Sequence, residues 1–273
     1  IVFGDWSSDV CSSDLKARLF TNQSPEDLAV LFWDDPKVQA LAPAIKSQIA
    51  WFSVTEQLQA PGAWLEGDTL TVDLGKGPVA LLDRSELHLF GAHNVANALA
   101  AALLACSAGA TLEGVQATLS SFTGLDFALK LSATVRGRRF VNDSKGTNPP
   151  STLAALSAFT EPLVVIAGGL GKGADFTELG RVLAAKARAL VVIGQDGPAI
   201  TEAALAAGLA VWESAASLEE AVERAYALSQ PGDTVLLSPA CASQDMFRDY
   251  KQRGELFDKC VAALASREEK EAG

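Results

Sequence analysis

Three polar loops in the second half of the chain carry residue types that could bind an anionic substrate. The first, residues 142–148 (NDSKGTN), places Asp143, Lys145 and Thr147 directly after an apolar stretch and before a helical one. A loop that leaves a strand and enters a helix presents free backbone N–H groups and the positive end of the helix dipole, which bind carboxylate or phosphate. Lys145 adds a mobile cation, and Asp143 could hold a ribose hydroxyl or a metal-bound group. The alternative is a solvated turn in which Asn148 caps the next helix.

The other two loops have related chemistry. Residues 168–176 (GGLGKGADF) combine four glycines, which let the backbone approach a ligand closely, with the cation of Lys172. The spacing of these glycines matches neither the GxGxxG motif nor a Walker A loop. A dinucleotide-binding domain is the alternative function from another class, and it would also need Asp196 as the acid that binds the ribose. Residues 238–247 (SPACASQDMF) follow the last apolar stretch. Two lysine-bearing loops on neighbouring strand ends favour a negatively charged substrate shared between them.

The elements that position these loops form a regular series of strands and helices. Predicted strands are RRFVN, LVVIAGG, ALVVIG, LAVWE and DTVLLS, with helices beginning near Pro149, Thr177, Gly197 and Ser217 and a last helix from about Asp245 to Ala265. This βαβ pattern predicts an α/β, Rossmann-like domain with a mainly parallel sheet, whose ligands bind at the carboxyl ends of the strands. Upstream we expect strands at 28–32, 49–54 and 86–90, a hairpin at 63–74, and helices at 94–109 and 112–122.

Composition excludes several classes of protein. The net charge of −11 argues against a nucleic-acid partner, because phosphate backbones attract basic surfaces. No apolar run approaches the ~18 residues of a membrane span. The 4 cysteines and 2 histidines lack the spacing of a structural zinc site, so we expect reduced thiols in a cytoplasm.

The chain divides into five predicted parts. Residues 1–15 lack any periodicity and are expected to be a non-native artefact or a disordered tail. A first domain is expected at 16–122, a linker or hinge at 123–129, a second domain at 130–268 and a tail at 269–273.

The loop motifs resemble a known family. Together with GAHNVANALAA (91–101), the segments NDSKGTN, GGLGKGADF and SPACASQDMFRDYKQRGELF resemble the D-glutamate-adding branch of the Mur ligases of peptidoglycan synthesis. The resemblance runs from Lys16 to about Ala265 and implies part of a central ATP-binding domain followed by the ligase's C-terminal domain, in a cytoplasmic monomer. A folylpolyglutamate synthase or another Mur-type ligase remains the alternative, because the first motif is shared with those enzymes.

The resemblance also implies roles for single residues. Asn94 and Asn97 match nucleotide-contacting asparagines, although by themselves they would indicate an Asn-capped helix start. Lys16 matches a lysine that the family carbamylates and uses as a magnesium ligand, and its alternative is a surface salt-bridge lysine. Asp143 and Lys145 match residues that contact ATP. Lys16 and Lys145 would be the catalytic residues.

The substrate-binding residues match in the same way. Thr147 and Lys172 match residues that grip the incoming D-glutamate, while Ser243, Gln244 and Tyr250 match residues that hold its side-chain carboxylate. The implied reaction forms an acyl phosphate from ATP and UDP-N-acetylmuramoyl-L-alanine, which the D-glutamate amine attacks while Mg²⁺ and lysines neutralise charge.

The sequence departs from the family pattern in two respects. Ala128, Leu170 and the pair Phe32 and Trp33 replace residues that the family places near the nucleotide. No segment matches the family's GTxGKT/S phosphate loop or its UDP-binding domain. We therefore expect the chain to be the C-terminal part of a longer enzyme and to be inactive alone.

Overall fold

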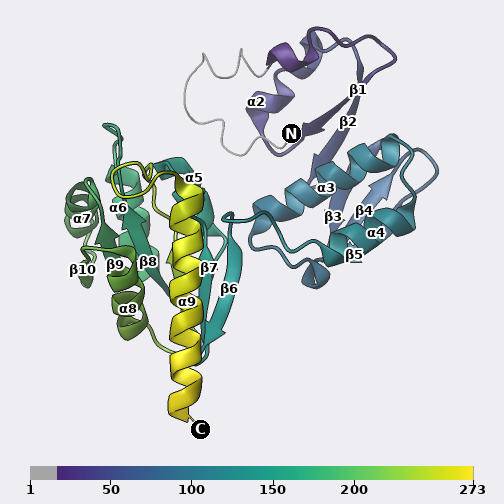
Figure 1. The fold of residues 1–273 in the computed structure, drawn as a ribbon. Helices are drawn as coiled ribbons and strands as arrows, with labels where there is room; N and C mark the ends of the chain where they lie inside the picture. The colour runs from purple at the N-terminus through teal and green to yellow at the C-terminus, as the bar shows by residue number, and fades with distance from the viewer. Residues whose placement is uncertain (1–16, 273) are drawn as a thin grey trace. The chain divides into compact units, whose positions relative to one another are not determined.

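The computed structural model describes residues 17–272, and the chain divides into two compact units between Thr123 and Gly124. Each unit has its own sheet (Figure 1). Each also has its own hydrophobic core. The predicted α/β class is confirmed. Among the described residues, no helix has both the length and the apolar character needed to cross a membrane.

The first unit is a five-stranded sheet covered by one long helix. Its strands follow chain order: β1 (Leu28–Phe32), β2 (Gln48–Ser53), β3 (Gly62–Glu66), β4 (Thr69–Asp73) and β5 (Val79–Asp83). The pairs β1–β2 and β2–β3 are parallel, and the last two pairs are antiparallel. Helix α3 (Ala92–Ser107) buries Leu99 and Leu103 in the same core as Ala50 and Leu70 of the sheet. The remaining elements are η1 (Arg18–Phe20), α2 (Pro36–Gln39), η2 (Ala42–Ala44), η3 (Arg84–Glu86) and α4 (Leu112–Ser121).

The predicted strand at 86–90 is wrong. The Asp83 carboxylate accepts the Ser85 backbone N–H at 2.9 Å, and the Glu86 carboxylate accepts the Asp83 N–H at 3.3 Å. This capping box starts the single turn η3 and so ends strand β5 at Asp83. The strand of this region is β5, which pairs antiparallel with β4.

The second unit is a six-stranded sheet in the order β10-β9-β8-β11-β7-β6. The strands are β6 (Lys130–Val135), β7 (Arg138–Asn142), β8 (Leu163–Gly168), β9 (Ala187–Ile193), β10 (Trp212–Ser214) and β11 (Thr234–Leu237). All neighbours are parallel except β6 and β7. The predicted mainly parallel sheet is therefore confirmed, although sequence reasoning missed β6. Strand β11, the last in sequence, lies in the centre between β8 and β7.

Helices cover both faces of this sheet. They are α5 (Pro149–Ser157), α6 (Thr177–Lys186), α7 (Gly197–Ala206), α8 (Leu218–Leu228) and α9 (Tyr250–Ala272). Helices α8 and α9 share a core with Ile166 and Val235, while the alternate strand residues point to the opposite face, where α5, α6 and α7 lie (Figure 1). Strands β8 and β11 are buried at every position, which explains why their residues are apolar apart from Thr234.

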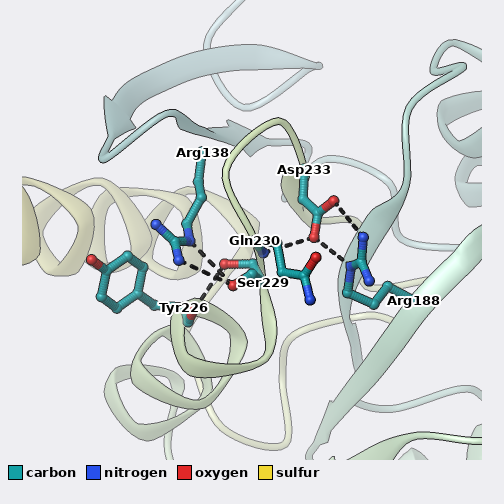
Figure 2. Close-up of polar contacts among 6 residues, drawn as sticks. All are labelled: Arg138, Arg188, Tyr226, Ser229, Gln230 and Asp233. Carbon is teal, nitrogen blue, oxygen red and sulfur yellow. Dashed lines mark hydrogen bonds and ion pairs between the residues drawn. The ribbon is translucent and has the colours of Figure 1, made fainter.

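A polar network ties the turn before β11 to two other strands of the sheet (Figure 2). Arg188 of β9 donates to both carboxylate oxygens of Asp233, at 2.6 and 3.1 Å. Asp233 also accepts a backbone N–H from three residues earlier in the turn, at 2.8 Å. Arg138 of β7 donates twice to the Ser229 carbonyl, both at 3.2 Å, and its guanidinium carbon lies 4.8 Å from the Tyr226 ring centroid. These contacts fix the N-terminal end of the central strand β11 and thereby help to fix the position of its C-terminal end.

Candidate functional site

The three polar loops lie at one edge of the second sheet. They leave the carboxyl ends of β7, β11 and β8, which are adjacent in that order and parallel. The prediction that the two lysine-bearing loops lie on neighbouring strands is wrong. The crossover from β7 to β8 leaves one strand position between them, and β11 fills it. The third loop, at 238–249, therefore lies between the other two.

Backbone hydrogen bonds join this middle loop to both of its neighbours. Leu170 and Ala242 form an antiparallel bridge with N–H···O distances of 2.8 and 3.0 Å. On the other side, the Ala240 N–H donates to the Gly146 carbonyl at 2.9 Å, and Ala240 adopts a left-handed φ of 59°. The three loops consequently form one continuous surface.

Asp143 is buried beneath this surface. Its carboxylate accepts the Ser238 hydroxyl at 2.7 Å and the Leu129 backbone N–H at 3.3 Å. Ser238 also lies 2.9 Å from the Thr152 hydroxyl, and since a hydroxyl has one proton, Ser238 accepts from Thr152 when it donates to Asp143. Burial raises the pKa of Asp143 to about 7, although these hydrogen bonds oppose the rise. A Cβ at Gly146 would lie 2.5 Å from the Asp143 carboxylate, so only glycine fits there.

Arg253 is the central residue beneath the loops, and sequence reasoning did not single it out. It is 0% exposed and donates to the Ser144 hydroxyl at 3.0 Å, the Ser144 carbonyl at 2.9 Å and the Cys241 carbonyl at 3.3 Å. Burial lowers its pKa to about 10, so it stays protonated at neutral pH. Its position was detectable from helical spacing, because Arg253 precedes the buried Phe257 and Val261 by one and two turns and so lies on the core face of α9.

The predicted substrate-binding residues all belong to these loops or to the helix that follows them. Lys172 is exposed and has a left-handed φ of 55°, while Thr147 and Tyr250 are partly buried and Gln244 is exposed. Lys172 follows the Leu170 bridge residue by two positions. Ser243 directly follows Ala242, the bridge partner of Leu170. The structure therefore brings Lys172 and Ser243 to the same edge of the sheet, on adjacent loops. Lys145 is also exposed at this edge.

Ser243 carries the clearest sign of a ligand. The residue is 1% exposed, and its hydroxyl has no hydrogen-bond partner among residues 17–272. A buried hydroxyl without a partner costs about 1–3 kcal/mol. A ligand oxygen that accepts this hydroxyl proton would remove that cost, and a carboxylate is the acceptor best suited to do so.

Tyr250 lies at the start of the last helix rather than one and a half turns inside it. The predicted helix start at Asp245 is wrong, because the Asp245 carboxylate turns towards the neighbouring loop and accepts the Gln195 N–H at 2.8 Å. A new start follows, in which the Asp249 side chain accepts the Gln252 N–H at 2.9 Å, an N-cap interaction. The Tyr250 carbonyl accepts the Ser144 hydroxyl at 2.8 Å, which ties the start of α9 to the first loop.

Asn94 and Asn97 lie one turn apart near the start of α3 in the first unit. Gly91 is the N-cap and makes no side-chain cap hydrogen bond, so the interpretation as an Asn cap is wrong. Asn94 donates to the Phe90 carbonyl at 2.8 Å, and Asn97 donates to the Asn94 side-chain oxygen at 3.1 Å. The Asn97 side-chain oxygen is buried and has no partner among the described residues, so it can accept a donor from a ligand.

The other predicted positions fall in different places. Lys16 lies outside the described residues. Leu170 takes part in the cross-loop bridge through its backbone. Trp33 donates its indole N–H to Glu56 at 3.1 Å, beside Asp34, whose carboxylate accepts the Val54 N–H at 2.8 Å.

Comparison with known proteins identifies both units. Residues 13–105 match the Mur ligase middle domain, and residues 129–241 match the Mur ligase glutamate ligase domain. The UDP-N-acetylmuramoylalanine--D-glutamate ligase of Pelotomaculum thermopropionicum is 43% identical over 249 residues, which are 91% of this chain and 54% of that protein. The enzyme of the same name from Desulfitobacterium hafniense (strain Y51) is 42% identical over 246 residues, 90% of this chain and 54% of that protein. The chain thus spans about half the length of these curated relatives.

Solved structures agree on the fold. A folylpolyglutamate synthase of Mycobacterium tuberculosis, complexed with ADP and AMPPCP, superimposes with a TM-score of 0.65 at 19% identity, covering 93% of this chain and 61% of that one. MurF of Acinetobacter baumannii gives a TM-score of 0.64 at 22% identity, covering 92% of this chain and 54% of that one. Because the two family models together match residues 13–105 and 129–241, the chain belongs to the Mur ligase family, and its two units match that family's middle and glutamate ligase domains.

Proposed function

We propose that this chain is part of an ATP-dependent ligase that joins D-glutamate to UDP-N-acetylmuramoyl-L-alanine in the bacterial cytoplasm. The name shared by the 43% and 42% identical relatives supports this substrate pair. The observation that carries the proposal is the buried, unpartnered hydroxyl of Ser243, in a loop that is bonded directly to the loop of Lys172. Because the chain spans 54% of the relatives' length, the activity is proposed for the whole protein that contains it.

D-Glutamate carries two carboxylates, so its site needs two groups of donors a few ångströms apart. In the proposal, Lys172 and Thr147 bind one carboxylate. The Ser243 hydroxyl and Gln244 bind the other, and the Tyr250 ring forms a wall of the pocket. A charge-assisted hydrogen bond of this kind is worth about 1.5–3 kcal/mol.

Nucleotide binding is assigned by family resemblance and by one structural feature. The unpartnered side-chain oxygen of Asn97, held by its bond to Asn94, suits an N–H donor such as the exocyclic amine of adenine. By the family resemblance, Asp143 and Lys145 are proposed to contact ATP, with Lys145 neutralising the phosphoryl group that moves to the substrate carboxylate. The D-glutamate amine would then attack the acyl phosphate, forming the amide and releasing phosphate.

Magnesium is proposed from the family alone. Among residues 17–272 there is no group of three or more His, Cys, Asp or Glu side chains that could hold a metal ion, and the proposed ligand Lys16 lies outside that range. We therefore assign no metal-dependent step to the described residues.

The dinucleotide-binding alternative receives no support from the structure. It requires the Asp196 carboxylate to face a ribose. That carboxylate instead accepts the Gly171 backbone N–H at 2.6 Å, inside the loop that would have carried the pyrophosphate.

A chimaera tests the proposed function. The matching part of the Pelotomaculum thermopropionicum ligase is replaced by this chain, and phosphate release is measured with ATP, UDP-N-acetylmuramoyl-L-alanine and different amino acids. We expect release with D-glutamate but not with L-glutamate. Equal release with L-glutamate, or release that requires a folate substrate, would contradict the proposal.

Single substitutions in the chimaera test the residue roles. Lys172→Ala and Ser243→Ala should each raise the KM for D-glutamate by roughly 10- to 150-fold, equivalent to about 1.5–3 kcal/mol, and change the KM for ATP by less than about threefold. Lys259→Ala, an exposed lysine on α9, is the matched control and should change neither KM. Unchanged D-glutamate kinetics in both variants would mean that these loops are structural.

A further inference from the structure

The segment that connects the two units is bonded to the second unit from Phe127 onward. The Phe127 carbonyl accepts the Lys145 backbone N–H at 2.9 Å, and the Leu129 N–H donates to Asp143 at 3.3 Å. Phe127 and Leu129 adopt left-handed φ values of 63° and 50°, a conformation that non-glycine residues keep only where surrounding contacts hold them. The backbone at 127–129 is therefore fixed to the loop of residues 142–148.

The side chain of Phe127 reaches the first turn of α9. Its ring lies edge-on to the Tyr250 ring, with centroids 6.4 Å apart and an interplanar angle of 75°. It also rests directly against Gly254, one turn further along the helix. A Cβ at Gly254 would lie 2.2 Å from Phe127 Cδ1, so the absence of a side chain at Gly254 creates the space that the ring occupies.

We propose that Phe127 is a positioning residue that sets the place of the Tyr250 ring beside the D-glutamate site, so that the connecting segment and the amino-acid pocket move together. Tyr250 is held through its backbone by Ser144, at 2.8 Å, but its ring has this edge-on contact with Phe127. The inference rests on the proposed function for the identity of the substrate. The contact itself is independent of that function.

The contact between Phe127 and Gly254 can be disrupted by a substitution at either residue. Phe127→Ala removes the ring. Gly254→Ala adds a methyl group where the ring lies, although alanine is the better helix former, so a loss of order can come only from the clash with Phe127. In a chain that already carries Phe127→Ala, the Gly254→Ala change should therefore become harmless.

Amide hydrogen exchange in this chain measures the anchoring without any substrate. We expect Phe127→Ala and Gly254→Ala each to lower the protection of the Lys145 amide at least about tenfold, whereas the double variant should be no worse than Phe127→Ala alone. Leu125→Ala, a 58% exposed position in the same segment, is the control and should leave protection unchanged. Equal effects of Gly254→Ala in both backgrounds would overturn the anchoring.

Kinetics in the chimaera measure the positioning. Phe127→Ala should raise the KM for D-glutamate about tenfold and change the KM for ATP by less than about twofold, and Phe127→Tyr, which keeps the ring, should restore the KM for D-glutamate. An unchanged KM for D-glutamate, or equal changes in both KM values, would overturn the positioning role. A wild-type chimaera without D-glutamate-dependent turnover would instead overturn the proposed function and the pocket assignment with it, while the exchange experiment still decides the anchoring.

Discussion

Replacing Arg253 by methionine should destabilise the second unit by about 2–4 kcal/mol. The guanidinium is the shared donor for the Ser144 hydroxyl, the Ser144 carbonyl and the Cys241 carbonyl, and all of these groups are buried. Each acceptor that loses its donor costs about 1–3 kcal/mol, and the sum is partly offset because methionine buries no charge. Methionine fills most of the arginine volume, so the cavity contribution stays small.

The assay is the free energy of unfolding of the second unit, obtained from amide exchange at Val235 and Leu236 in the central strand. Arg248→Met is the matched control, because the Arg248 side chain is 78% exposed and its contact with Asp249 is 3.3 Å, and it should cost less than about 0.5 kcal/mol. Arg253→Lys keeps the charge but loses the planar guanidinium group with its several N–H donors. Its loss of unfolding free energy should lie between those of Arg253→Met and Arg248→Met. A loss of less than about 1 kcal/mol in Arg253→Met would refute the reasoning that Arg253 holds the loops together.

Three further predictions concern single groups. Ser243→Ala should raise the free energy of unfolding of the ligand-free chain by about 1 kcal/mol, because it removes a buried hydroxyl without a partner, and a drop in urea denaturation would contradict this. The pKa of Asp143 is about 7 when folded against an ordinary 3.8, so the folded state holds an extra proton between these values and stability should fall by up to about 4 kcal/mol as pH rises from about 4 to about 7. Asp143→Asn should flatten this pH dependence in denaturation series, and an unchanged slope would exclude Asp143 as its source. Asp233→Asn should cost about 1–3 kcal/mol through the weakened contact with Arg188, measured by urea denaturation, and Arg188→Gln should then add little in the double variant.

The buried strands were predictable from the sequence because their environment leaves one simple pattern. Strands β8 and β11 are covered on both faces, so their residues are apolar apart from Thr234 at the start of β11, and the loops that follow are visible as abrupt polar changes. Strand β6 has no such pattern, since most of its residues are partly exposed at the sheet edge, and it was missed. The false strand at 86–90 has apolar residues, but a local capping box at Asp83 decides its backbone.

The candidate site was predictable only in part, for a related reason. Loops at strand ends reveal the residues that we propose to face a ligand, such as Lys172 and Ser243. The supports beneath them depend on contacts between distant segments. Arg253 bonds to Ser144, and Phe127 packs on Gly254, and no spacing rule relates either pair.

The central position of β11 has a consequence for how the protein is made. Ribosomes deliver β7 and β8 first, and until β11 arrives each of these strands presents an open edge to the gap between them. The nascent sheet is thus open at its middle rather than at its rim, which exposes apolar strand edges to other chains during synthesis. A polypeptide interrupted before Thr234 would keep this gap and would also lack the loop that joins the two lysine-bearing loops. Synthesis of β11 and the loop after it therefore both closes the aggregation-prone edges and joins the two lysine-bearing loops.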